Sequence, residues 1–142
     1  MSIDAADRAA VAHFVRVCGS GVVATVGEQG EPQAAYVVMY AGDDAVLVFD
    51  AAVDSRKVAN IARDPRIAVA VTGAAVTVQL EGEARATQGA ERARLGEEYC
   101  RHFPSSRALD DGYALFAVDV RWVRVYDTGN HPPHVSEARW GS

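Results

Sequence analysis

Short β-rich segments separated by turn sequences are the feature that most limits how this chain can fold. Three such segments, VVATV, QAAYVVMY and AVLVFD, follow one another between residues 22 and 50. The connecting sequences GEQGEP and AGDD are rich in Gly, Pro and Asp, which favour the tight turns that join antiparallel strands. Further strand-like segments lie at residues 66–72, 76–87, 113–120 and 122–127. The interior Gly82 indicates a bulge or a bend in the second of these.

Three segments with helical periodicity do not alternate with these strands. The first follows Asp4, a suitable N-cap, the second lies between Ser55 and Pro65, and the third covers residues 89–103. A doubly wound sheet would need regular alternation of strands and helices. The order therefore predicts a mainly β fold, an antiparallel barrel of about six strands with peripheral helices. Residues 128–142 have turn composition and are expected to form an irregular tail.

Length and charge limit the classes of function. The 142 residues fit one domain, and a net charge of −5 repels nucleic acid. Cys18 and Cys100 are isolated thiols, as is usual in a reducing compartment. The acidic N-terminus is unlike a signal peptide, and no apolar segment approaches the length of a membrane span. We therefore expect a cytoplasmic protein with no nucleic-acid or membrane partner.

The segment DSRKVAN, residues 54–60, contains Lys57, the only lysine in the chain. It is predicted to begin a short helix, where unpaired N–H groups and the helix dipole favour an anion. Arg56 and Lys57 would add fixed positive charge, so a phosphate would fit. In the alternative interpretation, Asp54 or Ser55 caps the helix and the two basic side chains are merely solvated.

Three segments together resemble a known family of flavoproteins. ATVGEQGEPQAAYVVMY, VLVFDAAVDSRKVANIARDPRIAVAV and VQLEGEA are similar to the pyridoxamine 5′-phosphate oxidase-like FMN-binding split-barrel proteins over roughly residues 20–126. Ser-Arg-Lys before a short helix, followed by Asp-Pro-Arg and a strand, is the most specific part. The resemblance implies a six-stranded antiparallel split β-barrel that forms a homodimer, with FMN in the clefts between subunits.

The resemblance also implies a set of cofactor-binding residues. They comprise residues that bind the flavin phosphate, two stretches of strand beside the flavin ring, a polar residue from the partner subunit and an aromatic residue at the end of the last strand. In this order they are Ser55, Arg56 and Lys57; Tyr36, Val37 and Val38 with Phe49 and Asp50; Thr77 or Gln79; and Tyr126. Core packing is the alternative interpretation for the three aromatic residues, since aromatic residues on strands usually pack.

Two departures argue against oxidation of vitamin B6. In pyridoxamine phosphate oxidases an Arg and a Lys flank the ring-contacting strand, and the corresponding positions fall near Ala34 and Met39. The C-terminal Arg-His element that contacts the pyridoxal substrate is not reproduced in TGNHPPHVSEARWGS. Smaller relatives bind FMN, the 8-hydroxy-5-deazaflavin coenzyme or haem.

The leading functional prediction is a flavin- or deazaflavin-dependent oxidoreductase that acts on a small-molecule substrate. Because the cofactor would carry out hydride transfer, no catalytic side chain and no metal ligand is assigned. A non-catalytic flavin-binding or haem-binding module is the alternative. For haem, His131 and His134 are the only spaced pair of histidines, and no third ligand accompanies them.

Overall fold

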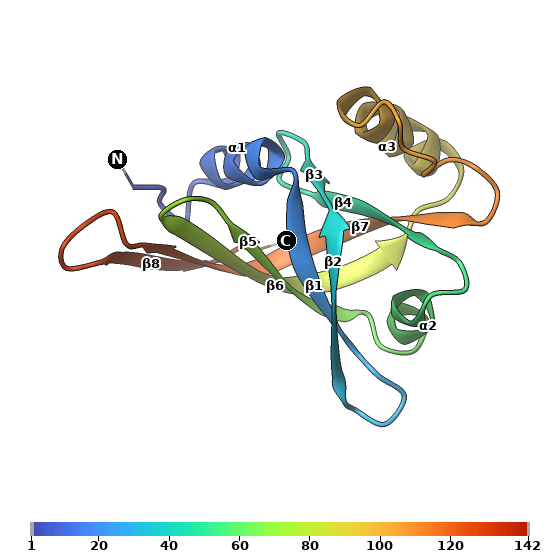
Figure 1. The fold of residues 1–142 in the computed structure, drawn as a ribbon, viewed down its shortest axis with the longest axis horizontal. Coiled ribbons are helices and arrows are strands. Elements are labelled where there is room, and N and C mark those ends of the chain that lie inside the picture. The colour runs from blue at the N-terminus through green and yellow to red at the C-terminus, as the bar shows by residue number, and fades with distance from the viewer. Residues whose placement is uncertain (1, 142) are drawn as a thin grey trace.

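A single curled antiparallel sheet forms the body of the protein, and the computed structural model describes residues 2–141. The helices are α1 (Arg8–Cys18), α2 (Arg56–Arg63) and α3 (Gly89–His102). The strands are β1 (Ser20–Val26), β2 (Pro32–Val38), β3 (Tyr40–Ala41), β4 (Leu47–Ala52), β5 (Arg66–Thr72), β6 (Val76–Ala86), β7 (Tyr113–Asp127) and β8 (His134–Arg139). The sheet order is β2-β1-β5-β6-β7-β4-β3, and β8 also pairs with β7 (Figure 1).

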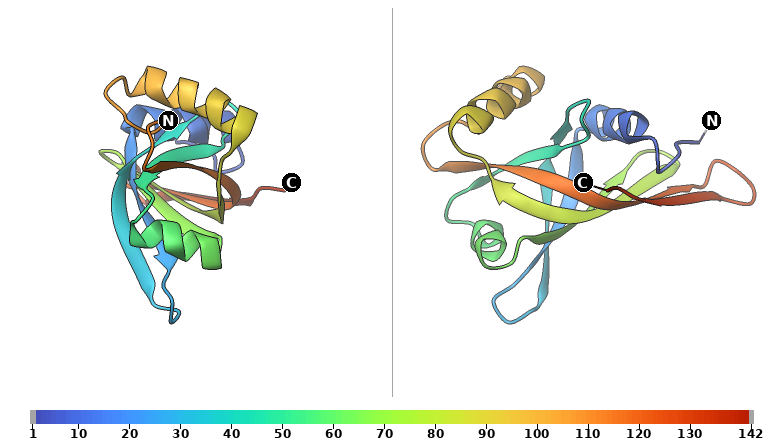
Figure 2. Two further views of the ribbon diagram at one scale, coloured as in Figure 1. Left: turned by 90° about the vertical axis from the view of Figure 1, so that its right-hand side faces the viewer. Right: turned by 180° about the vertical axis from the view of Figure 1, so that it is seen from behind.

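The predicted mainly β split barrel is confirmed, but the strand count is corrected. The structure has an eight-stranded sheet, whereas the sequence pattern predicted about six strands. The segments 113–120 and 122–127 form one continuous strand, and the short β3 separates from β2. The sheet curls around its core, with α1 and α3 on one side and α2 on the other (Figure 2).

Helix boundaries follow local capping chemistry. Asp7, and not Asp4, caps α1, because its side chain accepts a hydrogen bond from the backbone N–H of Ala10 at 3.1 Å. The helix ends at Gly19, whose φ of 71° lies in the left-handed region that glycine adopts readily. The second helix ends at Asp64, before Pro65, as predicted.

Gly82 lies at a β-bulge, as its position inside a strand predicted. The register between β6 and β7 shifts between Glu81 and Gly82. A Cβ atom at Gly82 would lie 2.1 Å from the backbone oxygen of Asp119. The two backbones therefore approach more closely here than any side chain would allow.

Two apolar clusters stabilise the fold on opposite faces of β4 and β7. The larger fills the inside of the curled sheet and includes Val23, Phe49 and Val123. The smaller lies beneath α3 and contains Tyr99 and Leu115, with four other buried residues. Within residues 2–141, every helix is too short or too polar to cross a membrane.

The prediction of an irregular tail is wrong, because β8 pairs with β7 over residues 134–139. Trp140, just after β8, is only 5% exposed. Its indole N–H donates to the backbone oxygen of Ala5 at 2.9 Å, and the guanidinium of Arg8 lies 4.9 Å from the centre of its ring. The C-terminal strand is thus attached to the segment before α1.

We predict that Trp140→Ala lowers the free energy of unfolding by about 3–5 kcal/mol, the usual cost of removing a large buried aromatic side chain. Replacement of the exposed His134 by Ala in the same strand should change it by less than about 0.5 kcal/mol. Urea denaturation of both variants measures the difference. Equal midpoints for the two variants would mean that the tail does not contribute to the fold.

Candidate functional site

The N-terminus of α2 lacks a side-chain cap. Ser55 occupies the N-cap position with extended backbone angles, but its hydroxyl accepts no bond from the helix. The same Oγ atom is buried and has no hydrogen-bond partner within residues 2–141. A buried hydroxyl without a partner costs about 1–3 kcal/mol, so this atom favours a ligand that can hydrogen-bond to it.

Two basic residues, Arg56 and Lys57, follow Ser55 in the first turn of α2, and Asp54 precedes it. The first turn of α2 has no acidic residue. Neither Arg56 nor Lys57 forms an ion pair in the part of the chain that the structure describes. Basic residues in a first turn oppose the helix dipole unless an anion is nearby. Capping by Ser55, one of the two alternatives raised by the sequence, does not occur.

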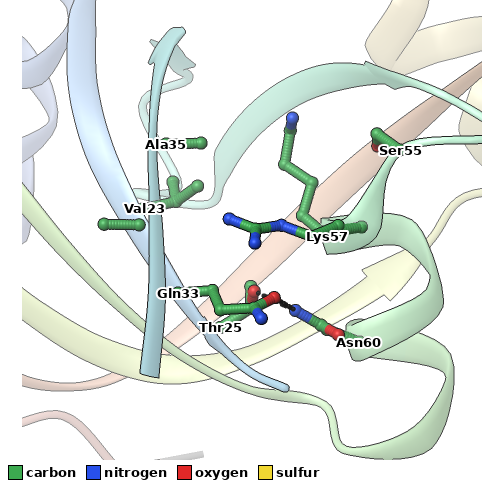
Figure 3. A pocket seen from close by; sticks show the side chains of 9 residues that line it. Val23, Thr25, Gln33, Ala35, Ser55, Lys57 and Asn60 are labelled. Carbon is green, nitrogen blue, oxygen red and sulfur yellow. Dashed lines mark hydrogen bonds between the residues drawn. The ribbon is translucent and has the colours of Figure 1, made fainter. Parts of the chain in front are cut away.

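A pocket of about 240 Å³ lies between α2 and the strands β1 and β2. Ser55 and Lys57 lie on the helix side, and Val23 and Ala35 lie on the strand side (Figure 3). Small-molecule sites usually have about 300–1,000 Å³. The pocket of one chain is therefore large enough for only part of a cofactor.

Asn60 holds the helix against the sheet, and sequence reasoning missed its role. It is 3% exposed, and its side-chain amide donates to Thr25 Oγ1 and Gln33 Oε1, both at 2.9 Å (Figure 3). Its Oδ1 accepts from Arg63 at 2.8 Å. Apolar residues at helical spacing pointed to Val58, Ile61 and Ala62, and Asn60 lies on a different face of an ideal helix from these residues, so periodicity carried no signal for its role.

The predicted ring-contacting residues on β2 alternate in exposure. Tyr36 and Val38 are 72% and 44% exposed, whereas Val37 is 8% exposed. Because β2 ends the sheet order, its outer backbone edge has no strand partner among residues 2–141. This edge begins beside the pocket at Ala35 and continues to Val38.

Phe49 and Asp50 have different environments. Phe49 is 0% exposed and stacks on Phe116 with ring centroids 5.4 Å apart, so its side chain belongs to the core. Only its backbone could contribute to a cofactor wall. The Asp50 carboxylate faces the other way and accepts a hydrogen bond from the hydroxyl of Tyr99 at 2.5 Å. Burial, followed by the hydrogen bond and charge of Asp50, raises the pKa of Tyr99, so this hydroxyl remains a donor.

The remaining predicted contacts lie away from the pocket of their own chain. Thr77 pairs directly with Tyr126, and neither lines the pocket beside Lys57. Gln79 lies in register with Ala70, Val22 and Tyr36 across the sheet, so these residues share one face. Within residues 2–141 there is no group of three or more His, Cys, Asp and Glu side chains that could hold a metal ion.

Comparison with known proteins identifies the family. Residues 8–127 match the family model for pyridoxamine 5′-phosphate oxidase. The chain belongs to the pyridoxamine 5′-phosphate oxidase-like family. No curated protein matches it.

Solved structures of similar fold include members with different stated ligands. A heme binding protein from Mycobacterium smegmatis has a TM-score of 0.80 and 19% identity; the match covers 98% of this chain but only 59% of that one. A pyridoxamine 5′-phosphate oxidase-related, FMN binding protein from Nostoc punctiforme has a TM-score of 0.68, 15% identity and full coverage of both chains. A conserved hypothetical protein from Mycobacterium tuberculosis has a TM-score of 0.74 and 21% identity, over 99% and 98% of the two chains. At these identities the likeness concerns the fold.

Proposed function

We propose that this family member is an oxidoreductase that binds FMN, or the deazaflavin coenzyme, with the phosphate at Ser55, Arg56 and Lys57. The observation that carries the proposal is the buried, unpaired Ser55 hydroxyl beside two unpaired basic residues at an uncapped helix N-terminus. A phosphate would accept hydrogen bonds from the hydroxyl and from the free N–H groups, and it would neutralise the charge.

Within this proposal the chain binds and orients the cofactor, and the cofactor supplies hydride transfer when bound. Lys57 offers a compact ammonium group, and Arg56 offers a planar guanidinium to the same phosphate. Asn60 holds α2 at a fixed distance from β1 and β2 through its bonds to Thr25 and Gln33. The free edge of β2 would then lie beside the ring.

Oxidation of vitamin B6 is not part of the proposal. Ala34, at one of the two positions where pyridoxamine phosphate oxidases carry a basic residue, lines the pocket without a charge. Met39, at the other position, is fully buried in the core. This environment would not accept a lysine without a partner for its charge.

A non-catalytic flavin-binding or haem-binding module is the alternative. The similar fold of a heme binding protein supports haem, but no histidine, cysteine or methionine lines the pocket at α2. His134 lies at the start of β8, on another part of the sheet. A Soret band in the purified protein would favour haem, and flavin binding without turnover of NAD(P)H would favour a storage or sensor role.

A homodimer would complete the small pocket. The outer face of β1 and β2 exposes Val22, Tyr36 and Val38, and the neighbouring outward positions are alanines, Ala24 and Ala34 among them. An exposed apolar face of this kind is typical of a subunit interface. The outward-facing Thr77, Gln79 and Tyr126 would then reach the cofactor of the partner subunit.

We predict a dimer by light scattering at micromolar concentration. Tyr36→Glu should yield a monomer that binds FMN more weakly, because a charge would be buried in the interface. Val17→Glu is the matched control, since Val17 is 70% exposed on α1, outside this face. A monomeric wild-type protein would refute both the dimer and the composite cofactor site.

Tyr126→Ala should weaken FMN binding more than it weakens folding. Contact with an aromatic ring is worth about 0.5–1.5 kcal/mol, or about two- to tenfold in affinity. Tyr126 is 37% exposed and Tyr99 is 0% exposed, so removal of Tyr126 should lower the urea midpoint of the cofactor-free protein less than removal of Tyr99. The buried Tyr99→Ala serves as the comparison for a core tyrosine. If the midpoint of Tyr126→Ala falls as far as that of Tyr99→Ala, Tyr126 is a packing residue.

Lys57→Ala should weaken FMN binding about ten- to a hundredfold, because charge-assisted hydrogen bonds contribute about 1.5–3 kcal/mol each. Fluorescence titration measures the affinity, and added salt should reduce the wild-type affinity more than that of the variant. Riboflavin, which lacks the phosphate, should bind wild type and variant almost equally. Arg101→Ala removes an exposed charge from α3 and should leave FMN binding unchanged. Equal FMN affinities for wild type and Lys57→Ala would contradict the assignment.

A further inference from the structure

A second pocket, of about 300 Å³, lies at the other end of the free β2 edge. Val38 at the end of β2 and Asp50 on β4 form one side. Phe103 and Ser106, which follow α3, and Tyr113, the first residue of β7, also line the pocket. The pocket thus combines apolar walls with a carboxylate, and its volume lies at the lower end of the range of small-molecule sites.

The carboxylate in this pocket is fixed at one oxygen and free at the other. Tyr99 is 0% exposed, and its hydroxyl donates to Asp50 Oδ1. No donor in residues 2–141 bonds to Oδ2 of Asp50, and no basic side chain in that range forms an ion pair with it. A carboxylate held in this way offers an oriented acceptor to a ligand.

The negative charge of Asp50 is not balanced by its neighbours. Arg107 is the basic residue of the pocket, but it pairs with Asp110 at 2.8 Å. Its guanidinium also lies 5.8 Å from the centre of the Tyr113 ring. Asp110 lies outside the pocket lining and compensates the charge of Arg107. The carboxylate of Asp50 has no ion-pair partner within residues 2–141, so it can attract a cation.

We infer that this pocket binds a small organic cation with N–H donors, such as a protonated amine, and that Asp50 accepts its hydrogen bond. Tyr99 is a positioning residue, because it contacts the carboxylate and not the ligand. The role of the bound cation rests on the proposed function. Ala35 lines the pocket beside Lys57, and Val38 lies three residues farther, about 10 Å along β2. The cation would thus lie beside the end of a bound flavin that is remote from the phosphate.

Titration of the cofactor-free, ¹⁵N-labelled protein with benzylamine tests the inference, with the neutral benzyl alcohol as control. Benzylamine should cause saturable shifts at the amides of Val38, Asp50 and Ser106, and it should bind about tenfold or more tightly than the alcohol. Asp50→Asn should remove this preference, because the amide keeps the shape and loses the charge. Asp111→Asn, which changes an exposed residue in the loop between α3 and β7, should retain it.

Tyr99→Phe keeps the ring in the core and removes only the hydroxyl, so it should reduce the preference for the amine without abolishing binding. Equal binding of amine and alcohol to the wild type, or an unchanged preference in Asp50→Asn, would overturn the inference. Because these titrations contain no flavin, their outcome is independent of whether FMN binds. In the FMN-loaded protein, saturating benzylamine should shift the flavin absorption band, and no shift would overturn the location beside the ring.

Discussion

The antiparallel ladder between β6 and β7 joins the two halves of the sheet. Strands β5, β1 and β2 attach through β6, whereas β4, β3 and β8 attach through β7. The ladder continues past the bulge at Gly82, where a Cβ atom would collide with the backbone of Asp119. Bulges increase local twist, so this one allows two long strands to curl. The curl brings α2 and β2 to one side of the molecule, where the pocket lined by Ser55 and Lys57 lies.

The polar contacts of α2 show how the pocket between this helix and the strands β1 and β2 is maintained. A short helix contributes little stability by itself, and α2 buries only Asn60 and Ile61. The side chain of Asn60 makes its bonds to two strands and to Arg63, each worth about 0.5–1.5 kcal/mol. The hydroxyl of Ser55, at the N-cap of this helix, has no hydrogen-bond partner within residues 2–141. The amide of Asn60 therefore fixes the position of the helix, whereas the hydroxyl of Ser55 remains available to a ligand.

Local signals in the sequence predicted those elements whose boundaries are set by neighbouring residues. Strand β5 matches the predicted range 66–72, α2 ends before Pro65, and Gly82 marks a bulge. The tail could not be predicted in this way. Strand β8 depends on pairing with β7 and on the bond between Trp140 and Ala5, 135 residues apart.

The candidate site was predictable in part for the same reason. The Ser55–Lys57 segment has a local signature, namely two basic residues at a predicted helix start, whereas the lack of a cap bond from Ser55 is seen only in the structure. The environment of Phe49 depends on which face of β4 points into the main core. A strand that is buried on both faces has no alternation of apolar and polar residues, so its sequence does not indicate which face that is. Strand β4 is of this kind, because it is covered by the main core on one face and by α3 on the other.

In the proposed arrangement, cofactor binding and subunit association would be connected through β2. This strand ends the sheet order, so one edge of its backbone lacks a strand partner in the described part of the chain. Its outward side chains Tyr36 and Val38 are exposed. Unpaired edges and exposed apolar faces favour non-specific association unless something covers them. A flavin along the edge and a second copy on the face would cover both. In the proposed arrangement neither is dispensable, since one chain provides a pocket of only about 240 Å³ and the second chain would provide the remaining wall.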